Sequence, residues 1–444
     1  MPKNTRTTPL TTSTVSPPVI AQPLKSTNHA AMAMVTSLFF MWGLLTSLND
    51  ILVPHLKSVF DLNYTEVILI QFCFFSAYFI FAIPSGKLIE KVGYKRSMAA
   101  GLLTMALGAA LFIPAASVPA FPLFLAALIV LAAGMTILQV SANPYVAVLG
   151  PPKTAASRLN LAQAFNSLGT TIAPLLGSLF ILSSAPKTSE EMRAMPEAVR
   201  NAFRLHEASS VKLPYLGLAL TLLLLGVAIS KFNLPAFVAV GSGRAVIEGV
   251  KDSVWKHRRL VLGAVGIFVY VGAEVAIGSF LVNYLSGPEI GAMPVKTAAR
   301  YVSLYWGGAM IGRFVGSSVL QKVRTGTVLG CAGIAAFALV TTSMLSLGSV
   351  AVWSILAIGF FNSVMFPSIF TLSIEGLGPL TEAGSGLLVA AIVGGAIIPE
   401  LQGVFADRIG IHHAFFLPAI CYIYISYFAF YGSRSVRGEP GTVA

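Results

Sequence analysis

Long apolar runs with almost no charge inside them recur along the whole chain. Of its 444 residues, 56% are hydrophobic and only 10% are charged. A water-soluble chain carries roughly 25% charged residues, so this one has too little polar surface to cover a soluble globule. We therefore predict an all-α integral membrane protein.

A helix needs about 20 mostly apolar residues to cross the hydrocarbon core of a bilayer, and we predict twelve such spans. The first six are expected near residues 31–56, 66–86, 97–117, 121–148, 159–183 and 213–232. The second six are expected near residues 260–285, 299–320, 327–347, 350–374, 383–404 and 412–432. Because the number is even, both termini are expected on the same side of the membrane.

Lysine and arginine are retained on the cytoplasmic side of membranes. If both termini are cytoplasmic, 20 of the 29 Lys and Arg residues fall on the inside and nine on the outside. Five of those nine lie in one loop, residues 185–212, beside four glutamates. The formal net charge of +12 is therefore explained by membrane orientation, and we predict no binding to nucleic acid.

An internal repeat relates the two sets of six spans. Phe39, Gly43, Val53 and Leu56 match Phe268, Gly272, Val282 and Leu285 at an offset of 229 residues. Leu149–Pro151 matches Leu377–Pro379 at 228, and Gly169 and Pro174 match Gly394 and Pro399 at 225. Duplicated six-helix halves with a binding site at their interface are typical of secondary transporters.

The repeat and the loop lengths divide the chain into five segments. The two pseudo-symmetric six-helix bundles are expected at residues 29–232 and 259–433, joined by a central cytoplasmic loop at 233–258. Residues 1–28 are rich in Thr, Ser and Pro, which predicts a disordered cytoplasmic tail, and residues 434–444 form a second tail. The three cysteines have no metal-ligand spacing, so no metal site is expected.

The turn between the second and third spans combines glycines with closely spaced charges. A helix that ends in glycine and is followed by an acid and several bases lets charge pairs form and break at the cytoplasmic face. The turn resembles the signature loop of the major facilitator superfamily, with Glu90 in place of the more usual Asp. The alternative is that the bases only anchor the turn. The candidate gating residues are Gly86, Glu90, Lys91, Gly93, Lys95 and Arg96.

Ionisable side chains inside a span are costly, so each is a candidate functional group. Asp50 follows Asn49 in a first span that is otherwise apolar. A carboxylate at low dielectric is costly to keep charged, so it can bind and release a proton, or it can bind sodium. The alternative is a structural Asp50 that pairs with a neighbouring helix or lies near the outer interface. Glu274, in the seventh span, is either a second titrating group or a partner for Arg313.

Uncharged amide side chains gather on the fourth and fifth spans, at spacings of four and three residues that keep them on one helix face. An amide offers both a donor and an acceptor to a sugar hydroxyl. Hydrogen bonding between helices is the alternative role. The candidate substrate-binding amides are Gln139, Asn143, Asn160, Gln163 and Asn166 in the first half and Asn283 and Asn362 in the second.

Longer segments around these candidates carry a closer resemblance. They are Ser47–Leu52, Ser141–Val146, Leu159–Ser167, Tyr270–Leu285 and Phe366–Phe370. Together they extend over nearly the whole chain after the tail, and they closely resemble the fucose–galactose–glucose:proton symporter branch of the major facilitator superfamily.

The resemblance implies roles for individual residues. A carboxylate at the position of Asp50 is tied to proton coupling in the fucose member, and the sugar-contacting polar residues fall at Asn49, Gln163 and Asn166. A second family carboxylate aligns with Gln139 and is absent. The context of Gln139 is similar to the glucose/galactose permease subgroup, which weakens any transfer of fucose specificity.

We predict a secondary active transporter that imports glucose or galactose by cation-coupled symport, with H+ or Na+ as the coupling ion and no other cofactor. N-acetylglucosamine, mannose and fucose are alternative substrates. Three other functions are considered. A drug or metabolite antiporter would be favoured by a cavity dominated by aromatic side chains with few amides. A membrane-embedded enzyme would need a clustered catalytic set, and a sugar sensor would carry a long signalling tail. We expect a monomer in the inner membrane of a bacterium, and no enzyme activity.

Overall fold

The computed structural model describes residues 26–60, 64–117, 121–180, 195–199, 202, 212–235 and 253–434. Of these, residues 48–60, 64–69, 71 and 174–180 are described by their backbone alone. The predicted tails at 1–28 and 434–444 and the predicted loop at 233–258 lie mostly outside the described residues.

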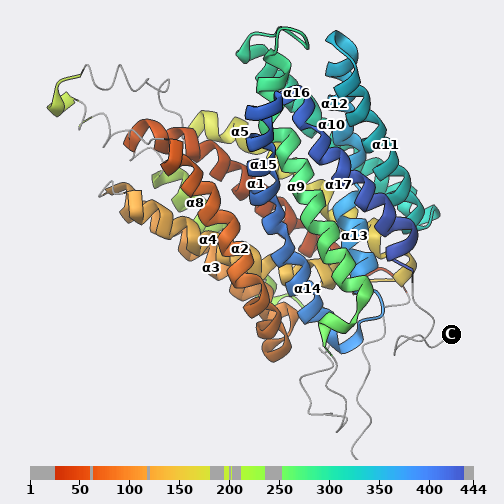
Figure 1. Ribbon diagram of the computed structural model, residues 1–444. Helices are drawn as coiled ribbons and strands as arrows, with labels where there is room; N and C mark the ends of the chain where they lie inside the picture. The colour runs from red at the N-terminus through yellow and green to blue at the C-terminus, as the bar shows by residue number, and fades with distance from the viewer. Residues whose placement is uncertain are drawn as a thin grey trace, which may run out of the picture.

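The described helices fall into two groups along the chain. The first group is α1 (His29–Phe60), α2 (Tyr64–Val92), α3 (Tyr94–Ser117), α4 (Phe121–Val148), α5 (Ala155–Phe180) and α8 (Lys212–Lys231). Within it, α3 packs against α4 and α8, and α1 packs against α5. In Figure 1 this group is drawn from red to yellow-green and lies to one side of the molecule.

The second group, green to blue in Figure 1, forms the other side. It begins with α9 (Arg258–Ser286), α10 (Val295–Lys322) and α11 (Thr325–Leu345). Each of the last three predicted spans is divided. They are α12 (Gly348–Asn362) with α13 (Met365–Ile374), α14 (Thr381–Ala390) with α15 (Gly394–Ile409), and α16 (Ile411–Ala414) with α17 (Phe416–Tyr427). When each pair of helices is counted as one span, the described helices account for the twelve predicted spans.

Two of these divisions follow from proline. The ring of a proline within a helix clashes with the carbonyl four residues earlier and removes a hydrogen bond. Pro367 stands four residues after Ser363, which lies at the break between α12 and α13. Pro418 stands four residues after Ala414, the last residue of α16. The predicted spans at 350–374 and 412–432 are present, and each contains one break that was not predicted.

Ten helical segments among the described residues are long and apolar enough to cross a membrane. Helices α5 and α10 are not among them, although both pair with other long helices. Asn160 and Gln163 lie on α5, and Arg313 lies on α10. Polar side chains at membrane depth face the protein interior rather than lipid, which identifies α5 and α10 as inner helices.

The repeated glycines make equivalent contacts in the two groups. A Cβ atom on Gly169 of α5 would lie 2.8 Å from the backbone nitrogen of Leu44 on α1. In the second group, a Cβ atom on Gly394 would lie 2.9 Å from Cα of Phe268 on α9. Only glycine allows such close helix packing, so the sequence repeat marks the same crossing of the first and fifth spans in each half.

The two halves touch through α5 and α10, α2 and α14, and α4 and α14. The described hydrogen bonds between them include Tyr94 Oη to Glu382 Oε1 at 2.8 Å and Ser157 Oγ to the Ser317 carbonyl at 2.6 Å. These residues lie near the helix ends at residues 92–94, 155, 322 and 381. We call this end of the molecule the closed end, because the described hydrogen bonds between the halves run from it to mid-height.

Candidate functional site

Amide side chains are buried on α4 and α5, which pack against each other. Gln139 and Asn143 of α4 are 4% and 0% exposed. Among the described residues, Gln139 Oε1 and both polar side-chain atoms of Asn143 have no hydrogen-bond partner. One turn from Asn143, the Val140 carbonyl accepts a hydrogen bond from Ser385 of the second half at 2.8 Å. These amides therefore lie where the two halves meet.

Asn160 and Gln163 continue this polar surface on α5, and both are buried. Asn160 Nδ2 donates to the Arg313 carbonyl of α10 at 2.7 Å, while its Oδ1 has no partner among the described residues. Buried polar groups are normally paired. Unpaired amide atoms on α4 and α5 thus form a set able to bind a polar ligand.

The remaining first-half candidates lie on α1 or contact it. Asn166 Nδ2 donates to the Phe39 carbonyl at 3.0 Å, so this amide joins α5 to α1. Asn49 and Asp50 lie on α1, but their side chains lie outside the described residues.

In the second half a buried cluster surrounds Glu274 of α9. Glu274 Oε1 lies 3.9 Å from an arm of the Arg313 guanidinium, and the two side chains are 12% and 14% exposed. Tyr270 and Tyr422, both buried, are close enough to Glu274 to interact with it electrostatically. Of the two predicted roles for Glu274, partnership with Arg313 is the one that this geometry displays.

Tyr305 extends the cluster to α12. Its hydroxyl accepts a hydrogen bond from Asn362 Nδ2 at 2.9 Å and reaches the Glu274 carbonyl at 3.5 Å. Asn362 is fully buried, and its Oδ1 has no partner among the described residues. The cluster therefore joins α9, α10, α12 and α17 through one glutamate, one arginine, one amide and three tyrosines.

Asn283 does not belong to this cluster. It is exposed and lies three residues before the end of α9, more than two turns beyond Glu274. The predicted substrate amides therefore lie on α4 and α5 in the first half and, as Asn362, in the Glu274 cluster of the second half, whereas Asn283 belongs to neither set.

The predicted gating turn lies at the closed end. Gly93 has a φ of +81° and makes the turn between α2 and α3. A Cβ atom on Gly86 would lie 2.9 Å from the Glu382 carbonyl, so α2 and α14 approach closely here. Among the described residues, Lys91, Lys95 and Arg96 form no ion pair. The polar contact between the halves is instead made by the Tyr94 hydroxyl and the buried Glu382, with Glu90 close enough to repel Glu382.

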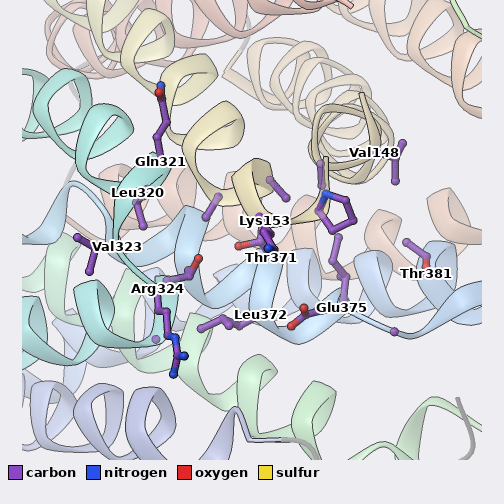
Figure 2. A pocket seen from close by; sticks show the side chains of 18 of the residues that line it. Val148, Lys153, Leu320, Gln321, Val323, Arg324, Thr371, Leu372, Glu375 and Thr381 are labelled. Carbon is purple, nitrogen blue, oxygen red and sulfur yellow. The ribbon is translucent and has the colours of Figure 1, made fainter. Parts of the chain in front are cut away.

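A cavity of about 950 Å³ opens beside this contact at the closed end. Figure 2 shows Val148 and Lys153 from the first half together with side chains from the α10–α11 turn and α13 of the second. Lys153, Lys322, Arg324, Glu375 and Glu382 give its lining both signs of charge. None of the predicted substrate amides lines this cavity.

Some functional candidates were missed in the sequence. Tyr270 lies one turn before Glu274, and Tyr305 lies two turns before Arg313, so helical spacing links both to the ionisable pair. Tyr422 and Glu382 carry no such signal, because they are brought to the cluster and to the closed end by helices distant in the sequence.

Two helical halves with polar side chains buried along their interface define a membrane transporter of the alternating-access type. The sequence profile of the Major Facilitator Superfamily matches residues 31–398, and the chain belongs to that family.

Curated relatives extend the likeness over nearly the whole chain. The glucose/galactose transporter of Brucella abortus biovar 1 (strain 9-941) is 52% identical over 406 residues, 91% of this chain and 94% of that one. The L-fucose-proton symporter of Escherichia coli (strain K12) is 36% identical over 409 residues, 91% and 93% of the two chains. The resemblance to the fucose–galactose–glucose branch is confirmed. Because these relatives are sugar transporters, the alternative of a membrane-embedded enzyme is excluded.

Solved structures agree. The Escherichia coli fucose:proton symporter FucP matches with a TM-score of 0.84 at 35% identity, covering 91% of this chain and 98% of that one. A structure of FucP in the outward conformation matches with a TM-score of 0.83 at 34% identity, covering 91% and 99%. The predicted twelve-helix major facilitator fold is confirmed.

Proposed function

We propose that this protein imports glucose or galactose by cation-coupled symport, with alternating access between its two halves. The observation that carries the proposal is the set of buried amide atoms on α4 and α5 that lack partners among the described residues. Such atoms can exchange hydrogen bonds with the hydroxyls of a neutral sugar. The 52% identical glucose/galactose transporter supports the same substrate class.

The amides take the role of substrate ligands. Gln139, Asn143, Asn160 and Gln163 bind hydroxyls from the first half, and Asn362 does so from the second. Asn49, Asn166 and Asn283 are retained as proposed substrate contacts, with Asn166 also holding α1 against α5.

Asp50 and Glu274 form the proposed coupling pair, with H+ or Na+ as the ion. The closed end is the cytoplasmic end in this proposal, because the positive-inside rule puts both termini in the cytoplasm. The gating turn, Gly86, Glu90, Lys91, Gly93, Lys95 and Arg96, then faces the cytoplasm. The protein acts as a monomer in the inner membrane of a bacterium.

The test is uptake of radiolabelled glucose into proteoliposomes under separately imposed H+ and Na+ gradients. We expect accumulation under one gradient. In Asp50→Asn, accumulation should be lost while counterflow exchange of glucose remains, because the sugar site is intact and only the ion site is changed. Asn143→Ala is the matched control, in which both activities should fall together.

Fucose is the second candidate substrate, since the 36% identical relative is an L-fucose-proton symporter. Unlabelled fucose, mannose and N-acetylglucosamine should compete weakly with labelled glucose. Absence of glucose uptake under either gradient, with uptake of one of these sugars instead, would overturn the glucose assignment. Accumulation that survives in Asp50→Asn would move the coupling role to Glu274.

A further inference from the structure

Arg313 is the one described side chain that contacts both a largely buried carboxylate of its own half and a polar group of the other half. One arm of its guanidinium lies 3.9 Å from Glu274 Oε1 on α9. The other arm donates a hydrogen bond to Ser167 Oγ on α5. Its backbone carbonyl accepts a hydrogen bond from Asn160 on the same helix. Arg313 is therefore shared between the two halves.

The charge of Arg313 is compensated within its own half. The side chain is 14% exposed, and a buried guanidinium is unfavourable without a counter-charge. Glu274 is the acidic group paired with it among the described residues. Ser167 supplies a hydrogen-bond acceptor but no charge.

Opening the closed end requires α5 and α10 to separate, because these helices are in contact between the halves. The bond from Arg313 to Ser167 must then break, whereas Glu274 moves with Arg313 in the second half. An ionised Glu274 thus keeps the guanidinium paired after the halves part. With a neutral Glu274, the guanidinium depends on acceptors of the first half.

We propose that Arg313 is a positioning residue of the transport cycle, which transmits the charge state of Glu274 to the contact between the halves. An ionised Glu274 allows the closed end to open, and a neutral Glu274 holds it closed through Ser167. The proposal rests on the alternating access proposed above, and it adds Arg313 and Ser167 to the coupling apparatus.

The test measures closure without a sugar. Ser157 Oγ lies 2.6 Å from the Ser317 carbonyl across the interface. Closure is measured as the rate of chemical cross-linking between two introduced cysteines, Ser157→Cys and Ser317→Cys. The native cysteines, Cys73, Cys331 and Cys421, are first replaced by Ser. We expect Glu274→Gln to favour the cross-linkable state by roughly tenfold and to slow glucose exchange to a similar extent, the size expected for a hydrogen bond to a charged group.

The decisive test is a second substitution that reverses the effect of Glu274→Gln. Ser167→Ala, added to Glu274→Gln, should restore both the cross-linking rate and exchange, because the guanidinium then has no acceptor at that position. Ser368→Ala, which removes a different buried hydroxyl of the second half, is the matched control and should restore neither. Arg313→Lys keeps the charge but loses the two-armed geometry, so Glu274→Gln should have little effect in that background.

Two results would overturn the role of Arg313. Either Glu274→Gln leaves the cross-linking rate unchanged, or Ser167→Ala and Ser368→Ala rescue Glu274→Gln equally. Size-exclusion profiles establish that each variant is folded. If Glu274→Gln does not fold, the single variant Arg313→Lys tests the proposal, because a lysine cannot reach both Glu274 and Ser167 with two arms and should therefore lower the cross-linking rate. A wild-type protein that transports no glucose but shows the same cross-linking pattern supports the role of Arg313 and overturns the sugar assignment alone.

Discussion

The buried polar side chains differ between the two halves. At the candidate sugar site on α4 and α5 they are uncharged amides, represented by Asn143 with no exposed surface and no described partner. On α9, α10, α12 and α17 they include Glu274, Arg313 and three tyrosines, and several of them interact with one another. The candidate sugar site of the first half therefore offers free hydrogen-bonding atoms, while the cluster around Glu274 in the second half holds paired charge.

This difference suggests a division of labour. Free amides can bind a neutral sugar without leaving an unpaired ion behind when the sugar departs. A carboxylate paired with an arginine responds to a proton or a cation and changes how that arginine is held. Because the two sets lie on opposite sides of the interface, sugar binding and ion binding can each bias the same contact between α5 and α10.

The largest expected effect is loss of sugar affinity in Asn143→Leu. Leucine has a similar size but removes both hydrogen-bonding atoms, so we expect roughly a 100-fold loss of glucose affinity in exchange, as for two lost polar contacts. Asn362→Leu is the second-half counterpart. It removes one proposed sugar contact and also the hydrogen bond to Tyr305 in the Glu274 cluster, so it should lower gradient-driven accumulation more than affinity. Equal losses of affinity in both variants would contradict the division of labour.

The helix crossings at Gly169 and Gly394 are expected to lose stability equally when either glycine is replaced by alanine. Gly169→Ala and Gly394→Ala each place a Cβ within 2.9 Å of a neighbouring backbone atom, and overpacking of this kind costs about 1–3 kcal/mol. Thermal unfolding in detergent should show a lower Tm for both. Gly217→Ala on α8 meets no atom within 4 Å and should leave Tm unchanged. A drop in only one of the first two would show that the repeated glycines are not equivalent.

The closed end gives the third prediction. In Tyr94→Phe the carboxylate of Glu382, only 4% exposed, loses its 2.8 Å hydrogen bond to the other half. We expect the cross-linkable fraction of the Ser157→Cys, Ser317→Cys protein to fall by roughly tenfold. Glu382→Gln keeps an acceptor for Tyr94 and removes the repulsion from Glu90, so it should cross-link at least as well as the parent. A loss in Glu382→Gln as large as in Tyr94→Phe would indicate that charge, and not the hydrogen bond, holds this end.

The fold was largely predictable from the sequence because each span is a local pattern. Apolar runs marked the spans, and the paired glycines marked the repeat. The breaks at Ser363 and Phe415 were not predicted, although Pro367 and Pro418 were the available signal. Span edges were also approximate, since α1 extends to Phe60 rather than to residue 56.

The site was less predictable because its contacts join distant segments. Amides on α4 and α5 were found through helical spacing, which operates within one helix. The contact of Arg313 with Ser167 spans 146 residues, and that of Tyr94 with Glu382 spans 288. No spacing rule reaches that far, so these partners emerged only from the packing of the halves.

The smallest expected effect concerns the hydroxyl that joins Asn362 to the Glu274 cluster. Tyr305→Phe keeps the ring but removes the acceptor of the 2.9 Å hydrogen bond from Asn362 Nδ2 and the donor of the 3.5 Å contact with the Glu274 carbonyl, so the cluster loses only neutral hydrogen bonds. We expect the ratio of gradient-driven accumulation to counterflow exchange to fall by roughly fivefold, with glucose affinity unchanged, because this hydroxyl belongs to the paired-charge side. Tyr424→Phe is the matched control, since that hydroxyl donates to the Leu262 carbonyl at 2.9 Å outside the cluster. If both variants lower the ratio equally, the second half responds to any lost tyrosine hydroxyl and the cluster around Glu274 has no special part in coupling.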